Sequence, residues 1–310
     1  MPACVETLFS VREVPWHGLG QILDNPVTSK EAIVAAGLDW NVITKEVYVG
    51  GVKTPGYVAN VRDSDNSVLG IVTNRYSIIQ NSEAFEFTDS LVSDGELTYE
   101  TAGSLRNGKQ IWLLGKLPKT EILGDDLEPY ICFTNTHDGT GAVRVCMTPV
   151  RVVCNNTLNL ALRTAKRSWS TRHTGDIQSK VREAQATLGM ANDYISALKQ
   201  EAENLANINV SDETIEGILD LIYPVKDDAS DLTKGRIDGL KEEFFRCLGM
   251  SDIKQFRGTA YGAMMAATDF ADHSKPLRVT KNSDENRWNA IIVGHPFVDT
   301  MFKQLEKIGA

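Results

Sequence analysis

The stretch LTYETAGSLRNGKQIWLLGKL, residues 97–117, most limits what this chain can fold into. Its two halves are rich in β-branched, aromatic and aliphatic residues, and they flank Arg106-Asn107-Gly108. Asn-Gly is the strongest two-residue turn signal because both residues tolerate positive φ. The stretch therefore predicts a β-hairpin. A second hairpin is predicted for YICFTNT and AVRVCM, which flank residues 137–141.

The rest of the N-terminal half reads as strands and short helices. Residues 40–50, 56–63 and 67–74 have the alternation and the β-branched residues typical of strands. Thr28 or Ser29 is predicted to cap a helix that Gly37 ends, and a further helix is predicted from Asn81 or Ser82.

The pattern changes at Thr148, where helices are expected to replace strands. Thr148 suits an N-cap and Pro149 the first helical position, so a helix is predicted from there to about Arg167. Apolar residues at steps of three and four predict a long helix over 176–208, and the last third also reads as helical. The predicted fold is α+β: an N-terminal antiparallel sheet of hairpins with short helices, followed by long helices and a helical C-terminal part. Residues 223–236 are the best linker candidate, which gives a core domain over 1–222 and a helical region over 223–310.

Composition and charge indicate the cellular compartment in which the protein is expected. The 310 residues carry a net charge of −9, and no apolar run approaches the ~18 residues that span a bilayer. The first twenty residues lack the basic and apolar segments of a secretory signal. Five cysteines are scattered without a CxxC pair, which favours reduced thiols in a cytoplasm. We expect no membrane association.

Positive charge is concentrated in one acid-free window between Asp138 and Asp176. The window's 37 residues hold a charge of +6, which leaves −15 for the rest of the chain. Single-stranded nucleic acid is bound by cations that follow the phosphates and by aromatic rings on which bases stack. Within RTAKRSWSTRHTG (163–175) the basic residues stand close to one tryptophan. The predicted binding residues are Arg144, Arg151, Arg163, Lys166, Arg167, Trp169, Arg172 and His173.

The alternative interpretation of this window needs no ligand. Arginines are common on exposed helices, and cations at a helix C-terminus interact favourably with the helix dipole. The dipole accounts for Arg163, Lys166 and Arg167 but not for Trp169 or the Arg172-His173 pair.

Motifs of catalysis and metal binding are weak. GSLRNGK has Gln110 where a phosphate-binding loop needs Ser or Thr, and GxGxxG, GxSxG and HExxH do not occur. Cys132, His137, Cys146 and Cys154 match no zinc spacing and are expected to be core residues. The loop PWHGLG (15–20) presents Trp16 and His17, either to fill an apolar gap or to reach a binding surface. We expect no enzyme, no cofactor and no metal.

Several long blocks resemble the phage/plasmid-like protein family, the domain of unknown function numbered 932. They include VPWHGLG, FTNTHDGTGAVRVCMTPVRVVCNNTLNLALR and SWSTRHTGDI, and the likeness covers roughly residues 10–225. The resemblance implies a protein of a phage, prophage or plasmid in a bacterial host, and carries no established chemistry. A weaker likeness, of architecture alone, is to phage single-strand annealing proteins of the RecT, Redβ and Erf kind, which form rings or filaments on single-stranded DNA.

Two functions from different classes are expected. The first is a non-enzymatic protein that binds and anneals single-stranded DNA in recombination, as a homo-oligomer in the host cytoplasm. The alternative is a phage protein that binds and inhibits a host defence protein, for which the −15 outside the basic window could supply a DNA-like or basic-partner surface. A nucleic-acid-processing enzyme ranks third.

Overall fold

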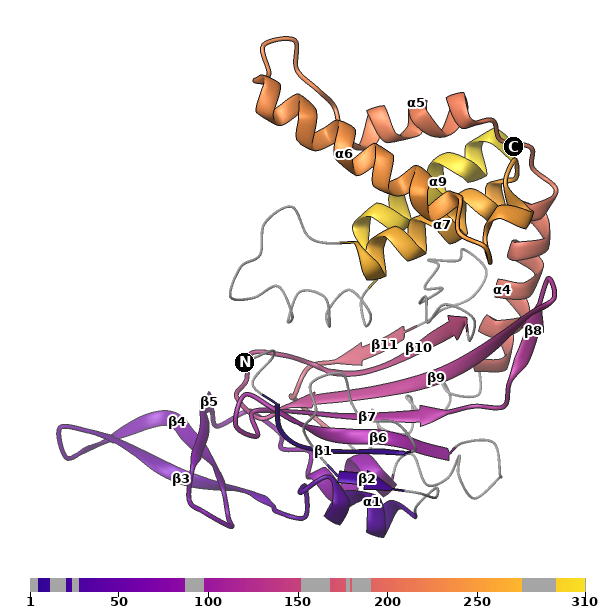
Figure 1. Ribbon diagram of the computed structural model, residues 1–310. Helices are drawn as coiled ribbons and strands as arrows, with labels where there is room; N and C mark the ends of the chain where they lie inside the picture. The colour runs from indigo at the N-terminus through magenta and orange to yellow at the C-terminus, as the bar shows by residue number, and fades with distance from the viewer. Residues whose placement is uncertain are drawn as a thin grey trace. The chain divides into compact units, whose positions relative to one another are not determined.

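The computed structural model of the protein describes residues 5–11, 21–23, 28–86, 98–151, 168–176, 179, 191–274 and 294–309 (Figure 1). Its contacts divide the chain into two compact units. Unit 1 holds Met1–Pro118, Tyr130–Met147 and Ser168–Ala191, and unit 2 holds Lys119–Pro129, Thr148–Arg167 and Asn192–Ala310. The predicted boundary between 222 and 223 falls inside unit 2, because α5 before it and α9 after it pack together.

The hairpin predicted at residues 97–117 is confirmed. β6 (Thr98–Leu105) pairs antiparallel with β7 (Gln110–Lys116), with Leu105 opposite Gln110. The loop has four residues, and Arg106, Asn107 and Gly108 all have positive φ, which the Asn-Gly sequence tolerates. The second predicted hairpin places β9 beside β10.

The larger sheet has the strand order β11-β10-β9-β7-β6-β1-β2, with β8 paired to β9. Its described pairings are antiparallel except that of β1 with β2. Phe9, Tyr99 and Leu113 are almost fully buried and belong to the core of unit 1. The remaining strands of this sheet are β1 (Val5–Val11), β2 (Gln21–Leu23), β8 (Thr120–Ile122), β9 (Asp125–Thr136), β10 (Val143–Arg151) and β11 (Ser168–Thr171).

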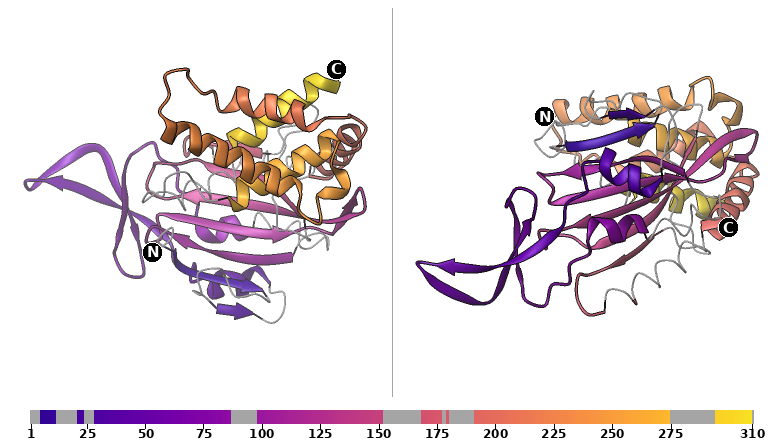
Figure 2. Two further views of the ribbon diagram at one scale, coloured as in Figure 1. Left: turned by 45° about the horizontal axis from the view of Figure 1, so that its top comes forward. Right: turned by 90° about the horizontal axis from the view of Figure 1, so that it is seen from below.

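A second, three-stranded sheet with the order β3-β4-β5 lies wholly in unit 1. The three predicted strands are confirmed as β3 (Val42–Val49), β4 (Val52–Arg62) and β5 (Val68–Thr73). The far end of the β3–β4 hairpin extends beyond the other strands of the unit in both views of Figure 2. The preceding helix α1 (Ser29–Ala35) is capped by Thr28, whose side chain and that of Glu31 form a capping box.

The helix predicted from Thr148 is wrong at its start. Residues 143–151 form strand β10, so Thr148 and Pro149 lie in a strand and not at a helix N-terminus. Four of the eight residues from Val143 to Val150 are β-branched, and this local preference for a strand prevails over the Thr-Pro cap signal. Residues 152–167, where the rest of that helix was predicted, lie outside the described residues.

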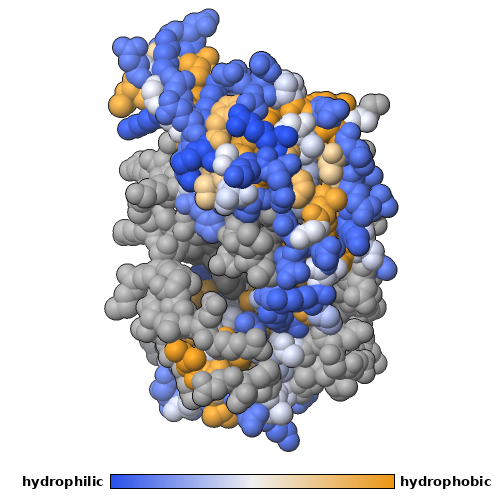
Figure 3. Space-filling view, turned by 45° about the vertical axis from the view of Figure 1, so that its right-hand side comes forward, coloured by the Kyte–Doolittle hydropathy of each residue, from blue (hydrophilic) through white to orange (hydrophobic). Residues whose placement is uncertain are grey.

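Unit 2 is largely helical, as the sequence predicts. Most of the surface of α7 is buried, and α7 packs against α6 and α9. On the face drawn in Figure 3, hydrophilic side chains predominate over the helices, with hydrophobic ones in smaller groups. The predicted linker is shorter than 223–236, because α6 begins at Asp231. The helices are α4 (Ala191–Ala206), α5 (Asp212–Ile222), α6 (Asp231–Leu248), α7 (Ala260–His273) and α9 (Pro296–Gly309), with a 3₁₀ turn η2 at Lys254–Phe256.

Two helical glycines of unit 2 are expected to respond oppositely to substitution by alanine. A Cβ at Gly262 in α7 would collide with the backbone carbonyl of Phe256, whereas Gly235 in α6 has open space around it. Gly262→Ala is expected to lower the free energy of unfolding by about 1–2 kcal/mol, and Gly235→Ala to raise it by about 0.5–1 kcal/mol. Urea unfolding followed by far-ultraviolet circular dichroism measures both. Equal effects of the two variants would contradict the close approach of η2 to α7.

Candidate nucleic-acid interface

Strands β10 and β11 carry part of the predicted basic window. These strands pair antiparallel, with Arg144 directly opposite Ser170. Directly opposed residues lie on the same face of a sheet, and alternation adds Ser168 to that face. Arg144 is half-buried, and both serines are exposed. β11 is the outermost described strand on this side of the sheet, so a cation and two hydroxyl donors lie along a sheet edge.

Trp169 lies on the other face of β11. It stands opposite Val145, and Thr171 stands opposite Val143; both valines are buried. Trp169 itself is half-buried. The structure therefore does not bring Trp169 onto the face of Arg144 and Ser170, as a combined stacking and phosphate site would require.

The end of β11 leads into a pair of stacked rings. Arg172 is exposed, and the next residue, His173, has a buried ring that stacks on Tyr76 with centroids 4.5 Å apart. The His173 Nδ1 lies 3.1 Å from the carbonyl oxygen of Ser77, and the Ser77 amide donates to the His173 carbonyl at 2.9 Å. His173 is thus a packing residue here, and we leave it out of the exposed surface.

The same contacts bring in Arg75, which the sequence analysis did not select. Arg75 is exposed and directly precedes Tyr76, as Arg172 directly precedes His173. The Tyr76–His173 stack therefore holds two arginine-bearing segments together that lie almost a hundred residues apart in the chain. The acid-free window could not reveal Arg75, because it lies far outside that window.

The side chains of four predicted binding residues lie outside the part of the chain that the structure describes. Arg163, Lys166 and Arg167 lie outside the described residues, and so does the PWHGLG loop. Arg151 is described as the last residue of β10, and its side chain is not. Arg144 and Arg172 are thus the predicted cations whose placement is described.

Unit 1 also contains a buried polar network. The Asn81 amide nitrogen donates to the carbonyl oxygens of Leu38 at 3.0 Å and Trp40 at 3.2 Å, and the Asn81 Oδ1 lies 3.0 Å from the His137 Nε2. The Asn60 amide donates to the His137 carbonyl at 2.7 Å, and the Asn135 amide donates to the carbonyl of Ile79 at 3.1 Å. All these side chains belong to unit 1 and are fully buried. The network ties β4, β9 and the segment around residues 79–81 together.

These bonds fix the tautomer of His137. Because the Asn81 amide nitrogen serves two carbonyls, its oxygen faces the ring and must accept a proton from Nε2. The Nδ1 has no hydrogen-bond partner among the described residues. The pKa of His137 is lowered to about 3, chiefly by burial and also by His173 and Arg62, against the opposing effect of Asp138. His137 is therefore a neutral, structural histidine.

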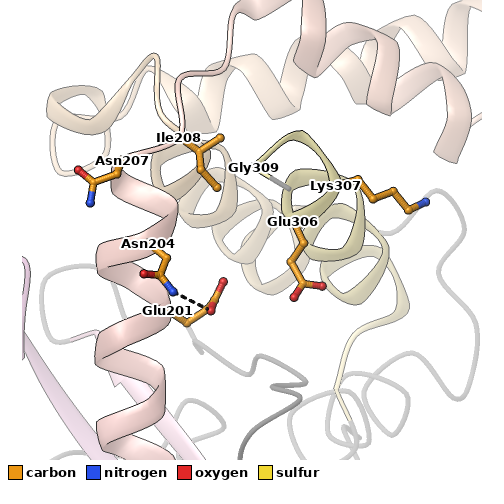
Figure 4. A pocket seen from close by; sticks show the side chains of 7 residues that line it. All are labelled: Glu201, Asn204, Asn207, Ile208, Glu306, Lys307 and Gly309. Atoms are coloured by element: carbon orange, nitrogen blue, oxygen red, sulfur yellow. Dashed lines mark hydrogen bonds between the residues drawn. The ribbon is translucent and has the colours of Figure 1, made fainter.

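Unit 2 contains a pocket of about 480 Å³ between the ends of α4 and α9 (Figure 4). Asn204 donates to Glu201 at 3.4 Å, Glu306 lines the pocket from α9, and Lys307 points away from α4. Two carboxylates at a pocket do not suit a phosphate. Over the residues that the structure covers, no group of His, Cys, Asp or Glu could hold a metal ion, and Cys132, Cys146 and Cys247 are buried in the core.

The fold defines an α+β protein with one mixed sheet, one projecting three-stranded sheet and a set of helices. The family model described as "Domain of unknown function (DUF932)" matches residues 68–292. This match covers more than half of the chain, and the protein belongs to that family. No curated protein and no solved structure matches the chain. Among the described helices, none is long and apolar enough to cross a membrane.

Proposed function

We propose that the protein binds single-stranded DNA at the β10–β11 edge and promotes the annealing of complementary strands, without cleaving DNA. The proposed surface consists of Arg75, Arg144, Ser168, Ser170 and Arg172. In this proposal the protein acts as a phage-encoded homo-oligomer in the cytoplasm of a bacterial host. The supporting observation is that Arg144 and Ser170 share a sheet face, with two further arginines joined at the end of β11 by the Tyr76–His173 stack.

The chemistry of this surface fits a phosphate backbone more than a base-reading site. Arginine guanidinium groups and serine hydroxyls donate to phosphate oxygens without regard to sequence. Annealing requires that the phosphates are held while the base edges stay free. A surface of cations and hydroxyls meets both conditions, and it requires no general acid, base or metal.

Binding of a labelled single-stranded oligonucleotide tests the proposal. Fluorescence anisotropy is measured for the parent, Arg75→Ala, Arg144→Ala and Arg172→Ala between about 50 and 200 mM salt. Each lost phosphate contact is expected to weaken binding and to reduce the slope of log K against log salt by roughly 0.7. The same substitutions are expected to slow the annealing of two complementary oligonucleotides.

A matched control removes two exposed cations from unit 2. Lys234→Ala/Arg236→Ala alters α6, which carries both side chains on the surface, and should leave affinity and salt slope unchanged. If Arg75→Ala, Arg144→Ala and Arg172→Ala all bind the oligonucleotide as the parent does at every salt concentration, the surface is wrongly assigned. The combined variant Arg163→Ala/Arg167→Ala then tests the rest of the predicted basic window.

A second candidate function rests on the charge of the helices. Residues 191–274 hold sixteen carboxylates against eight lysine and arginine side chains. Such a surface suits a basic protein partner, such as the DNA-binding face of a host defence protein. Retention of a host nuclease that high salt releases, with no affinity for oligonucleotides, would favour this inhibitor over the annealing protein.

A further inference from the structure

One face of the three-stranded sheet β3-β4-β5 is apolar and carries several exposed side chains. Alternation along β3 puts Ile43 and Val49 on this face, and Val52 lies directly opposite Val49. On β4 and β5 the register adds exposed apolar side chains to it, together with Ala59 and Val61, which are buried. Six large side chains of this face each expose between 39% and 71% of their surface. We name this set the arm face: Ile43, Val49, Val52, Tyr57, Val68 and Ile71.

The opposite face of the sheet already has its partners. Toward the tip, Glu46 forms an ion pair with Lys53 and accepts a hydrogen bond from Tyr48. Toward the base, Asn60 donates to the His137 carbonyl, and Gly70 lies so close to the Asp138 backbone that a Cβ would collide with it. Within residues 42–73, a range that is fully described, the arm face carries one charged residue, Lys45, whose ammonium group donates to the Asn66 Oδ1 at 2.6 Å.

We infer that the arm face packs against the arm face of a second copy of this chain. At roughly 100 Å² for each half-exposed large side chain, the six residues expose about 600 Å², which approaches the roughly 800 Å² per partner of a standard interface. Exposed apolar patches of this size mark contact sites in soluble proteins. Apolar sheet faces pack on each other in the two layers of a β-sandwich.

The apolar composition of the arm face favours a second copy of this chain over nucleic acid as its partner. A single lysine on an apolar surface gives no row of cations for phosphates. The inference goes beyond the proposed function and does not rest on it, because self-association through the arm face needs no nucleic acid.

Sedimentation velocity of the full chain, free of nucleic acid, tests the inference over about a hundredfold range of concentration. The parent is expected to form dimers or larger species. Val49→Lys/Ile71→Lys is expected to raise the Kd for self-association by about 100-fold or more, because association would bury ammonium groups with no carboxylate opposite. High salt should not dissociate the parent, since the contact is apolar, whereas it should weaken nucleic-acid binding.

The control places the same charges on the opposite face of the same strands. Thr44→Lys/Tyr48→Lys lies on that face, at two exposed positions, and should leave self-association within about threefold of the parent. Circular dichroism confirms that both variants fold. A parent that is monomeric at every concentration overturns the inference, and so does an assembly that survives the arm-face substitutions or dissociates equally in the control. Loss of self-association with oligonucleotide binding intact would support this inference and leave the proposed function standing.

Discussion

Replacing Asn81 by alanine is expected to destabilise unit 1 by about 3 kcal/mol or more, since each buried group left without a partner costs about 1–3 kcal/mol. The Asn81 side chain joins three groups: the carbonyls of Leu38 and Trp40, and the His137 Nε2–H. It is almost fully buried, so water cannot take its place without opening the core. Urea unfolding followed by tryptophan fluorescence reports on this unit through Trp40 and Trp112, which both lie within it.

The matched control is Asn74→Ala. Asn74 is exposed, and its backbone amide, which the substitution retains, donates to the carbonyl of Gly56 at 3.0 Å. This variant should change the free energy of unfolding by no more than about 0.5 kcal/mol, as is usual for surface positions. Similar losses in both variants would mean that the Asn81 bonds do not hold the segments around Leu38 and His137 together.

Most of the strands and helices could be predicted from local sequence. The β6–β7 hairpin follows from Asn107-Gly108, because the turn requires positive φ and few residues accept it at low cost. Helix α1 follows from Thr28 and Glu31, which satisfy its first free amides. In such cases the physical cause lies within a few residues, and the sequence displays it directly.

The error at Thr148 shows where local signals compete. Thr-Pro is equally compatible with a helix start and with a strand residue that donates no hydrogen bond. The strand forms because β9 and the run from Val143 are neighbours across a short loop. The sequence of residues 148–151 alone does not show this pairing, so it could not decide between a strand and a helix N-cap.

The candidate site was only partly predictable for the same reason. Charge clustering selected Arg144 and Arg172, which the structure describes on β10 and just beyond β11. It could not exclude the ring of His173, whose burial depends on Tyr76, nor place Trp169 on the opposite face, which depends on the pairing of β11 with β10. Arg75 reaches the site through pairing across almost a hundred residues. A contact between residues so far apart in the chain cannot be recognised from a short segment of sequence.

The free energy of unfolding of unit 1 is expected to fall as the pH is lowered from about 7 to 5, through His137. Burial holds the pKa of His137 at about 3 in the folded protein, below the 6.5 of an exposed histidine. Above pH 6.5 both states are neutral and the contribution of His137 is fully present. Below it the unfolded chain binds a proton that the folded protein does not accept, so stability is lost, by up to about 1.4 kcal/mol per pH unit.

Urea unfolding at a series of pH values compares the parent with His137→Gln, whose amide can still donate to Asn81 but does not titrate. The variant should lose most of the slope between about pH 5 and 7, a range above the ordinary pKa values of carboxyl groups. His273→Gln, at an exposed position near the end of α7, should keep the slope of the parent. An unchanged slope in His137→Gln would contradict the lowered pKa, because it would mean that the folded and unfolded chains bind the His137 proton equally well.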